Sequence, residues 1–160
     1  MKLKPVVLSL FLILLAIGGL FGYQSSLSNR HVELNQAQKY QRGEVRFKNA
    51  VIPVELAQTN EQRSRGLSFR DSLPPGEGML FVFPYPDRHT FWMKDMRFPL
   101  DIIWIAHDSI VDIKANLPPG AGTIPPSYTP KGKSDYVLEI NAGEVGRYQM
   151  KVGDRVGIRF

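Results

Sequence analysis

One stretch constrains the fold more than any other: residues 91–105, with the sequence FWMKDMRFPLDIIWI. It holds both tryptophans and passes from mixed polar and aromatic residues into an apolar run over residues 100–106, which only Asp101 interrupts. Such a run is typical of a strand buried on both faces, or on one face beneath a tight cover. Burying Asp101 costs free energy unless its carboxylate is hydrogen-bonded or paired. The stretch therefore predicts a central strand that carries one costly acid.

The N-terminal segment, residues 1–23, predicts an export signal or a membrane anchor. Lys2 and Lys4 precede an apolar run over residues 6–23 that only Ser9 interrupts, which is close to the length that spans a membrane. A buried core helix is the alternative, but the run has no polar face. No small-x-small cleavage site follows, so we favour an uncleaved anchor over a cleaved signal. The lysines would stay in the cytoplasm, placing the rest in the cell envelope on the extracytoplasmic side, or outside the cell if the signal is cleaved.

A polar spacer is expected over residues 24–43 and one domain over residues 44–160. Residues 1–43 carry five Lys and Arg against one acid, whereas residues 44–160 carry 15 against 14, a net charge of +1. The overall excess of +5 therefore comes mostly from the N-terminal part. A nearly neutral domain without a basic stripe argues against a nucleic-acid partner.

Residues 44–160 predict a mainly β, compact barrel-like or sandwich domain of about seven to nine short strands with one short helix. Twelve prolines and fourteen glycines supply the frequent turns that short strands need. The helix is expected from Thr59 to Gly66, because Thr59 and Gln62 have the spacing of a capping box and Gly66 suits the helix end. Pro53 would place its strand at an edge or a bulge. The expected strands cover residues 44–47, 51–57, 79–83, 89–93, 100–106, 110–113, 136–141 and 155–160.

Several motifs in this domain resemble those of the domain of unknown function 192 family. They are RGLSFR at 65–70, GMLFVF at 78–83, FWMKDM at 91–96, PLDIIW at 99–104, YVLEINAG at 136–143 and the closing Gly153-Asp154. The match covers nearly all of residues 45–160, in the right order. Two departures are Ser68, where the family usually has methionine, and Asp95, where asparagine is more usual. The resemblance implies a compact, mainly β fold in a bacterial or archaeal protein, often exported, and no known activity.

The candidate site residues begin with two acids, Asp101 and Glu139, inside two apolar strands. If the strands lie near one another, the acids could form a general acid/base pair or hold a cation. Alternatively, each accepts hydrogen bonds from Arg65, Arg70 or backbone N–H groups and fixes the fold. We expect one of the two acids to pair with Arg65 or Arg70.

A binding cleft is the second candidate. Trp92, Met93 and Lys94 place an aromatic ring, a flexible thioether and a cation in succession, with Trp92 on the opposite strand face from Met93. One face belongs to the core, and the other forms a groove wall or second-layer packing. The loop at 117–130 has five prolines in fourteen positions and ends near Tyr128. It either covers the site or is an inert connection.

Other chemistries have little support. The chain has no cysteine, which excludes disulfides and thiolate ligands, and its three histidines show no zinc spacing. It has no Gly-x-Ser-x-Gly motif, and no helix follows Gly120-Ala-Gly122 to cradle a phosphate. We therefore assign no catalytic residue, no metal site and no cofactor.

Three functions remain open. The first is a non-catalytic module that binds a small molecule or a protein near Trp92, Lys94 and the proline-rich loop. The second is an envelope hydrolase that uses Asp101 and Glu139 as a carboxylate pair, and the third is a structural accessory protein at the membrane. The separation and burial of the two acids distinguish the first two functions. An exposed apolar patch in place of a pocket would indicate the third.

Overall fold

The computed structural model describes residues 40–120 and 125–160. The predicted anchor and most of the predicted spacer lie outside this range. Among the described residues, no helix has the length and apolar character needed to cross a membrane. The strands are β1 (Gln41–Phe47), β2 (Ala50–Ala57), β3 (Gly78–Asp87), β4 (Phe91–Trp92), β5 (Leu100–Ala106), β6 (Ser109–Leu117), β7 (Ser127–Tyr128), β8 (Ser134–Asn141) and β9 (Gly157–Arg159). The helices are α2 (Asn60–Arg65) and α3 (Glu144–Tyr148).

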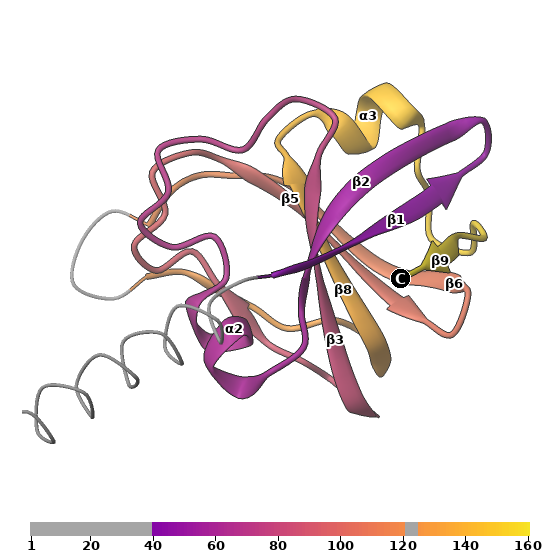
Figure 1. Cartoon of the computed structure of the whole chain (residues 1–160), viewed down its shortest axis with the longest axis horizontal. Helices are drawn as coiled ribbons and strands as arrows, with labels where there is room; N and C mark the ends of the chain where they lie inside the picture. The colour runs from indigo at the N-terminus through magenta and orange to yellow at the C-terminus, as the bar shows by residue number, and fades with distance from the viewer. Residues whose placement is uncertain (1–39, 121–124) are drawn as a thin grey trace, which may run out of the picture. The chain divides into compact units, whose positions relative to one another are not determined.

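Seven strands form one curled sheet in the order β6-β5-β8-β3-β2-β1-β9, and β4 pairs with β7 in a small second sheet. The only parallel pair in the described sheets is β2 with β3, which α2 connects. Figure 1 shows the strands fanning around a common centre. The C-terminal segment returns to the start of β6, where the backbone N–H of Val156 donates to the Asp108 carbonyl at 2.8 Å. The mainly β prediction is therefore confirmed, as a half-barrel.

The apolar run at residues 100–106 is β5, with the predicted bounds, and it lies between β6 and β8. Its first six residues are all buried, so the strand is covered on both faces. Ile103 and Ile105 belong to the core cluster on one face of the sheet, together with Leu80 and Leu138. Leu100, Ile102 and Trp104 belong to the cluster on the other face, which also contains Leu67, Leu73, Met93 and Met96 from the segments before β3 and around β4.

The predicted helix is confirmed as α2. Thr59 is its N-cap, the Thr59 side chain accepts a hydrogen bond from the Gln62 backbone N–H, and Gln62 bonds back to complete the capping box. Gly66 ends the helix with φ of 49°, a left-handed value that favours glycine. A Cβ there would lie 3.1 Å from the Phe81 ring. The end of α2 is therefore fixed by local sequence and packs directly on β3.

Helix α3 was not expected, because the sequence predicted only one short helix, at residues 59–66. Its N-cap is Gly143, which has no side chain to cap the helix. The cap comes from Asp101 on β5, whose Oδ2 accepts from the Val145 N–H at 2.8 Å. A cap supplied 44 residues away leaves no local signal.

Other boundaries differ from the predictions in length. The first strand, β1, begins at Gln41, three residues before the strand expected at 44–47, and the strand expected at 89–93 is only Phe91–Trp92. The prediction that Pro53 places its strand at an edge or a bulge was wrong, because β2 lies between β1 and β3 and its pairing with β1 is regular. Pro53 is tolerated there because the pairing with β3 begins only at Val54, so its missing N–H interrupts no ladder with β3.

Candidate functional site

The two candidate acids lie on neighbouring strands but on opposite faces of the sheet. Asp101 is paired with Ile140 across β5 and β8, and Ile102 is paired with Glu139. Because successive residues of a strand point to opposite faces, this register separates the two carboxyl groups by the thickness of the sheet. The arrangement does not bring Asp101 and Glu139 together as a catalytic pair.

Asp101 is fully buried and its carboxylate is satisfied by backbone groups. Oδ2 accepts from the Val145 N–H in α3, and Oδ1 accepts from the Asn116 N–H at 2.7 Å. Asn116 lies where the β5–β6 register shifts and has a left-handed φ of 57°. Asp101 therefore holds a bulge and a helix start in place. This outcome matches the alternative in which backbone N–H groups bind the acid and fix the fold.

Glu139 is 5% exposed, and its carboxyl group has no hydrogen-bond donor among the described residues. Burial raises the pKa of this carboxyl to about 8, although the positive charge of Arg70 acts in the opposite direction. At neutral pH the side chain is therefore mostly a neutral carboxylic acid. Strongly shifted pKa values in concave sites often mark functional groups.

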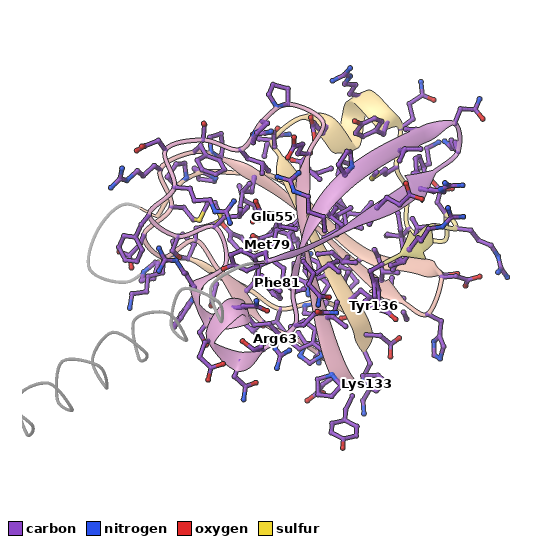
Figure 2. All side chains as sticks on the ribbon, in the orientation of Figure 1. Glu55, Arg63, Met79, Phe81, Lys133 and Tyr136 are labelled. Atoms are coloured by element: carbon purple, nitrogen blue, oxygen red, sulfur yellow. The ribbon has the colours of Figure 1, made fainter. Side chains whose placement is uncertain are left out.

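A row of paired residues runs across the Glu139 face of the sheet. Glu55 on β2 pairs with Met79 on β3, which pairs with Glu139. Met79 and Phe81 project from the same face of β3, with Glu55 and Arg63 on either side of them in Figure 2. The side chain of Met79 thus stands between the two glutamates.

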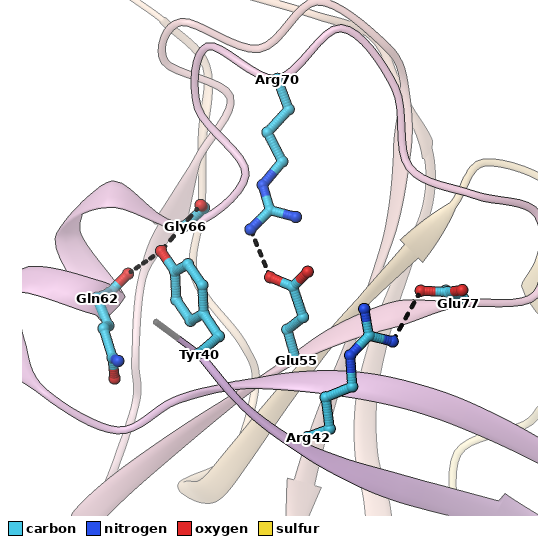
Figure 3. A network of polar contacts seen from close by, with 7 residues as sticks. All are labelled: Tyr40, Arg42, Glu55, Gln62, Gly66, Arg70 and Glu77. Atoms are coloured by element: carbon cyan, nitrogen blue, oxygen red, sulfur yellow. Dashed lines mark hydrogen bonds and ion pairs between the residues drawn. The ribbon is translucent and has the colours of Figure 1, made fainter. Parts of the chain in front are cut away.

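Arg70 forms its ion pair with Glu55, at 2.5 Å, rather than with either predicted acid. Its guanidinium also lies 5.4 Å from the centre of the Tyr40 ring, and the Tyr40 hydroxyl bonds the Gln62 and Gly66 carbonyls at 3.5 Å (Figure 3). Within the part of the chain that the structure describes, no arginine forms an ion pair with Asp101 or Glu139. The expected pairing is thus not formed, and Arg70 influences Glu139 only through its charge.

Glu139 forms part of a small hollow between α2, β3 and β4. This inner hollow has a volume of about 30 Å³. Its lining consists of Arg63, Ser64, Arg65, Gly66, Ser68, Phe81, Phe91, Trp92, Met96 and Glu139. A second, outer hollow of about 210 Å³ shares five of these residues and adds Phe83 and Thr90. We call the two together the Glu139 groove.

The aromatic wall of the groove comes from β3 and β4. Phe91 contacts Phe81 edge to face, with ring centres 4.8 Å apart, and also packs on Trp104. Trp92 is 55% exposed, whereas the following Met93 is buried. This alternation agrees with the prediction that one face of this strand belongs to the core. Trp92 from the exposed face and the half-buried Phe91 both line the groove.

Lys94 and Arg65 border the groove as cations. The Lys94 ammonium lies 5.5 Å from the centre of the Trp92 ring, and the Ser68 hydroxyl donates to the Lys94 carbonyl at 2.9 Å. Both cationic side chains are exposed, and neither has an acidic partner among the described side chains. Arg63, in contrast, is held by the Gln58 and Val82 carbonyls.

The backbone beside Lys94 explains one departure from the family pattern. Asp95 has a left-handed φ of 56°, and its carbonyl accepts from the Phe69 N–H at 2.9 Å. Asparagine and aspartate tolerate this conformation better than most residues. The position therefore requires a residue that tolerates a left-handed φ, and both aspartate and asparagine do.

Tyr128 does not line the groove. It pairs with Phe91 across β4 and β7 and packs against the core cluster of that face. The loop is attached to Met93 on both sides of residues 121–124, since the Met93 N–H donates to Pro126 and its carbonyl accepts from Gly120. The two described parts of the loop are thus fixed to the strand that carries Trp92.

The structure therefore brings together five of the seven candidates. Arg65, Trp92 and Glu139 line the groove, while Lys94 and Arg70 flank it. Asp101 and Tyr128 lie elsewhere. The main residues that sequence analysis missed are the aromatic ones, Phe81, Phe83 and Phe91. The first two alternate along a predicted strand, which was a usable signal. No group of three or more potential metal ligands occurs in the described ranges.

Comparison with known proteins finds one matching family and no matching curated protein. The profile of DUF192, "Uncharacterized ACR", matches residues 43–158. A crystal structure from Sinorhizobium meliloti 1021, described as a candidate transcription regulator, is 34% identical with a TM-score of 0.69 and covers 75% of this chain and 95% of its own. A protein of unknown function from Novosphingobium aromaticivorans DSM 12444 is 35% identical with a TM-score of 0.64, over 74% of this chain and 84% of its own.

Proposed function

This chain belongs to the DUF192 family, and we propose that its domain is a non-catalytic binding module that takes a small-molecule ligand in the Glu139 groove. The observation that carries this proposal is a carboxyl group, 5% exposed, that lacks a hydrogen-bond donor in the described fold and borders a hollow. A ligand in this hollow would supply the hydrogen-bond partner that the Glu139 carboxyl lacks among the described residues.

The lining of the groove favours binding over catalysis. Ligand sites combine an apolar wall with a few polar groups, as Phe81, Phe91 and Trp92 do with Glu139 here. The alternative, a hydrolase that uses a carboxylate pair, would need a second carboxylate near Glu139. Asp101 is on the opposite face, and Glu55 is paired with Arg70. Glu139 is thus the single acid in the lining of the two described hollows.

The description of the Sinorhizobium relative as a candidate transcription regulator does not carry over to this chain. DNA-binding surfaces concentrate Lys and Arg, whereas residues 44–160 have a net charge of +1. The expectation of no nucleic-acid partner therefore stands as a prediction. The envelope location also stands as a prediction, since it depends on residues 1–23.

The two tryptophans provide an internal test of this proposal. Trp92 forms the groove wall, whereas Trp104 is buried and its Nε1–H donates to the His89 carbonyl at 2.8 Å. We would label the indole nitrogens of the full-length protein and screen small-molecule fragments by NMR. Fragments that bind in the groove should move the Trp92 indole signal and leave the Trp104 signal nearly unchanged.

A matched pair of variants makes the test specific. Trp92→Ala should abolish the binding of those fragments, as measured by ligand-observed NMR. Phe160→Ala is the control, because Phe160 is 60% exposed, similar to Trp92, and lies beside Arg159 at the other end of the sheet. Fragments that bind equally well to both variants, or a diverse screen without any Trp92 response, would refute a ligand site in this groove.

A further inference from the structure

We propose that the ligand of the Glu139 groove is a small carboxylate, whose anionic group enters the inner hollow and whose apolar body lies against Phe83, Phe91 and Trp92. This inference rests on the proposed function and specifies its ligand. Three features support it: the charges around the groove, the sizes of the two hollows and the state of the Glu139 side chain.

The charges around the groove favour an anion. Arg63 and Arg65 line the inner hollow, Lys94 lies over Trp92, and Arg70 stands close enough to act on Glu139. Of the nearby acids, Glu55 is compensated by Arg70. Aromatic rings and a carboxyl group are also the parts of a cation site, but the surrounding guanidinium groups would repel a cation. The planar fork of an arginine such as Arg65 suits a carboxylate.

The sizes of the hollows divide the ligand into two parts. The inner hollow of about 30 Å³ has room for about two water-sized groups, which matches the two oxygens of a carboxylate. The outer hollow of about 210 Å³ is walled by the rings of Phe81, Phe83, Phe91 and Trp92. An aromatic or aliphatic body of a few carbons would fill it while its carboxylate points toward Glu139.

Glu139 can receive a carboxylate because its own group is neutral near pH 7. The protonated acid donates its O–H to the ligand oxygen, so the two carboxyl groups share one proton instead of repelling each other. The charged and titratable groups around Glu139 and the inner hollow are Arg63 and Arg65 on α2, Arg70 after α2, Glu55 on β2, Tyr40 before β1 and Lys94 after β4. The cations among them favour an added anion, and the one acid, Glu55, is paired with Arg70.

This arrangement makes the affinity depend on pH in one direction. Below about pH 8, the Glu139 carboxyl is protonated and the affinity should be constant. Above it, the affinity should fall by about tenfold per pH unit, because binding then requires proton uptake by Glu139. A ligand carboxylate stays ionised throughout, since its pKa is about 4.

The experiment compares three probes that share a phenyl ring: benzoate, neutral benzamide and cationic phenyltrimethylammonium. Each is titrated into the full-length protein at about pH 6.5 while the two indole signals are followed by NMR. We expect benzoate to move the Trp92 signal with at least tenfold higher affinity than either other probe. If benzamide or the cation moves Trp92 as strongly, the carboxylate inference fails while the ligand site remains. If no probe moves Trp92, the carboxylate inference fails, and the fragment screen decides separately whether the groove binds at all.

Two variants separate a role in binding from a role in folding. Glu139→Gln keeps a neutral hydrogen-bond donor, so benzoate binding should persist and lose its dependence on pH above 8. Arg65→Gln should weaken benzoate binding by about tenfold. The control Arg147→Gln removes an exposed arginine that lies over Tyr148 and should leave the affinity unchanged. A benzoate affinity in the unaltered protein that does not change between pH 7 and 10 would overturn the proposed role of Glu139.

Discussion

Asp101 and Glu139 are both buried and lie on neighbouring strands, one residue out of register, but their carboxyl groups differ in what they contact. Asp101 is fully buried and accepts two backbone hydrogen bonds, from Asn116 on β6 and Val145 on α3. Glu139 is nearly as buried but borders a hollow and has no donor among the described residues. Asp101 belongs to the architecture, since its bonds hold the β5–β6 bulge and α3. Glu139 contributes no such bond, which is why we assign it to the ligand.

The comparison teaches that burial alone does not distinguish a structural acid from a functional one. The distinguishing feature is what the carboxyl oxygens contact. An acid whose oxygens are all used by backbone N–H groups has nothing left for a ligand. Glu139, whose carboxyl group borders a hollow and has no donor among the described residues, keeps its hydrogen-bonding capacity for a ligand.

The largest effect should come from Asp101. Asp101→Ala removes two charge-assisted hydrogen bonds and leaves the N–H groups of Asn116 and Val145 unsatisfied, so we expect a loss of about 4 kcal/mol in the free energy of unfolding. Asp101→Asn keeps one acceptor and should lose about half as much. Urea unfolding measures both values. If Asp101→Ala lowers the free energy of unfolding by less than about 1 kcal/mol, Asp101 does not have the structural role described here.

The next largest change in stability should come from a substitution of Glu139, which should stabilise the protein instead of destabilising it. Its carboxyl has a pKa of about 8 when folded against 4.5 as the unperturbed value, so folding takes up a proton between these values. The free energy of unfolding is therefore highest below pH 4.5, where Glu139 is protonated in both states. Between pH 4.5 and 8 it falls by about 1.4 kcal/mol per pH unit, because only the unfolded chain releases the proton, and the contribution is lost as pH rises through 8. Glu139→Gln should therefore stabilise the protein by about 3 kcal/mol at pH 7.

The measurement for Glu139 is urea unfolding of the unaltered protein and the glutamine variant at a series of pH values. The difference between the two should grow from pH 5 to 8 and then level off. If the difference stays constant, or if the variant is less stable at pH 8, Glu139 would be a stabilising acid like Asp101.

A smaller effect should come from Arg70, which links the groove to the rest of the sheet. Arg70→Gln removes the charge that lowers the pKa of Glu139, so the pKa of Glu139 should rise further. The ion pair with Glu55 is partly exposed, with the two side chains at 29% and 23%, so the loss of stability should be only about 1 kcal/mol. A carbon NMR titration of the Glu139 carboxyl checks the first expectation, and thermal unfolding checks the second. A pKa of Glu139 that falls or stays the same would show that Arg70 is not its nearest compensating charge.

The smallest effect on stability should come from Trp92→Ala, although this substitution should abolish ligand binding. The side chain is 55% exposed, so Trp92→Ala should change the free energy of unfolding by at most about 1 kcal/mol. Trp104→Phe, which loses the bond to the His89 carbonyl, should destabilise the protein by about 1–2 kcal/mol yet keep the groove. Thermal unfolding ranks the two. A larger loss for Trp92→Ala than for Trp104→Phe would place Trp92 in the core.

The elements that local sequence specifies could be predicted. The capping box at Thr59 and Gln62 fixes α2, and the apolar run fixes β5 to the residue. The mainly β class follows from the spacing of short strands and turns. Helix α3 could not be predicted because its cap is a side chain of β5, brought near only by the folded chain.

The site could be predicted only as a list of residues. Alternation within β5 and within β8 is visible in the sequence, but the register between them is not, and a shift by one residue would place Asp101 and Glu139 on the same face. The carboxylate pair was therefore consistent with the sequence and is inconsistent with the observed register. Trp92 and Lys94 were found because an aromatic residue close to a cation stands out, and Arg65 was named only as a partner for the two acids, whereas Phe81 and Phe91 resembled ordinary core.

The most direct test of the difference between the two acids is the titration of the Glu139 carboxyl itself. We would label glutamate at its carboxyl carbon in the full-length protein, assign the Glu139 signal with Glu139→Gln, and follow it by NMR between pH 4 and 10. We predict a pKa near 8 that rises when benzoate is bound. A pKa near 4.5, the unperturbed value, would contradict the assignment of Glu139 to the ligand. Glu139 would then be an ionised, solvated side chain, and the groove would lose its neutral donor.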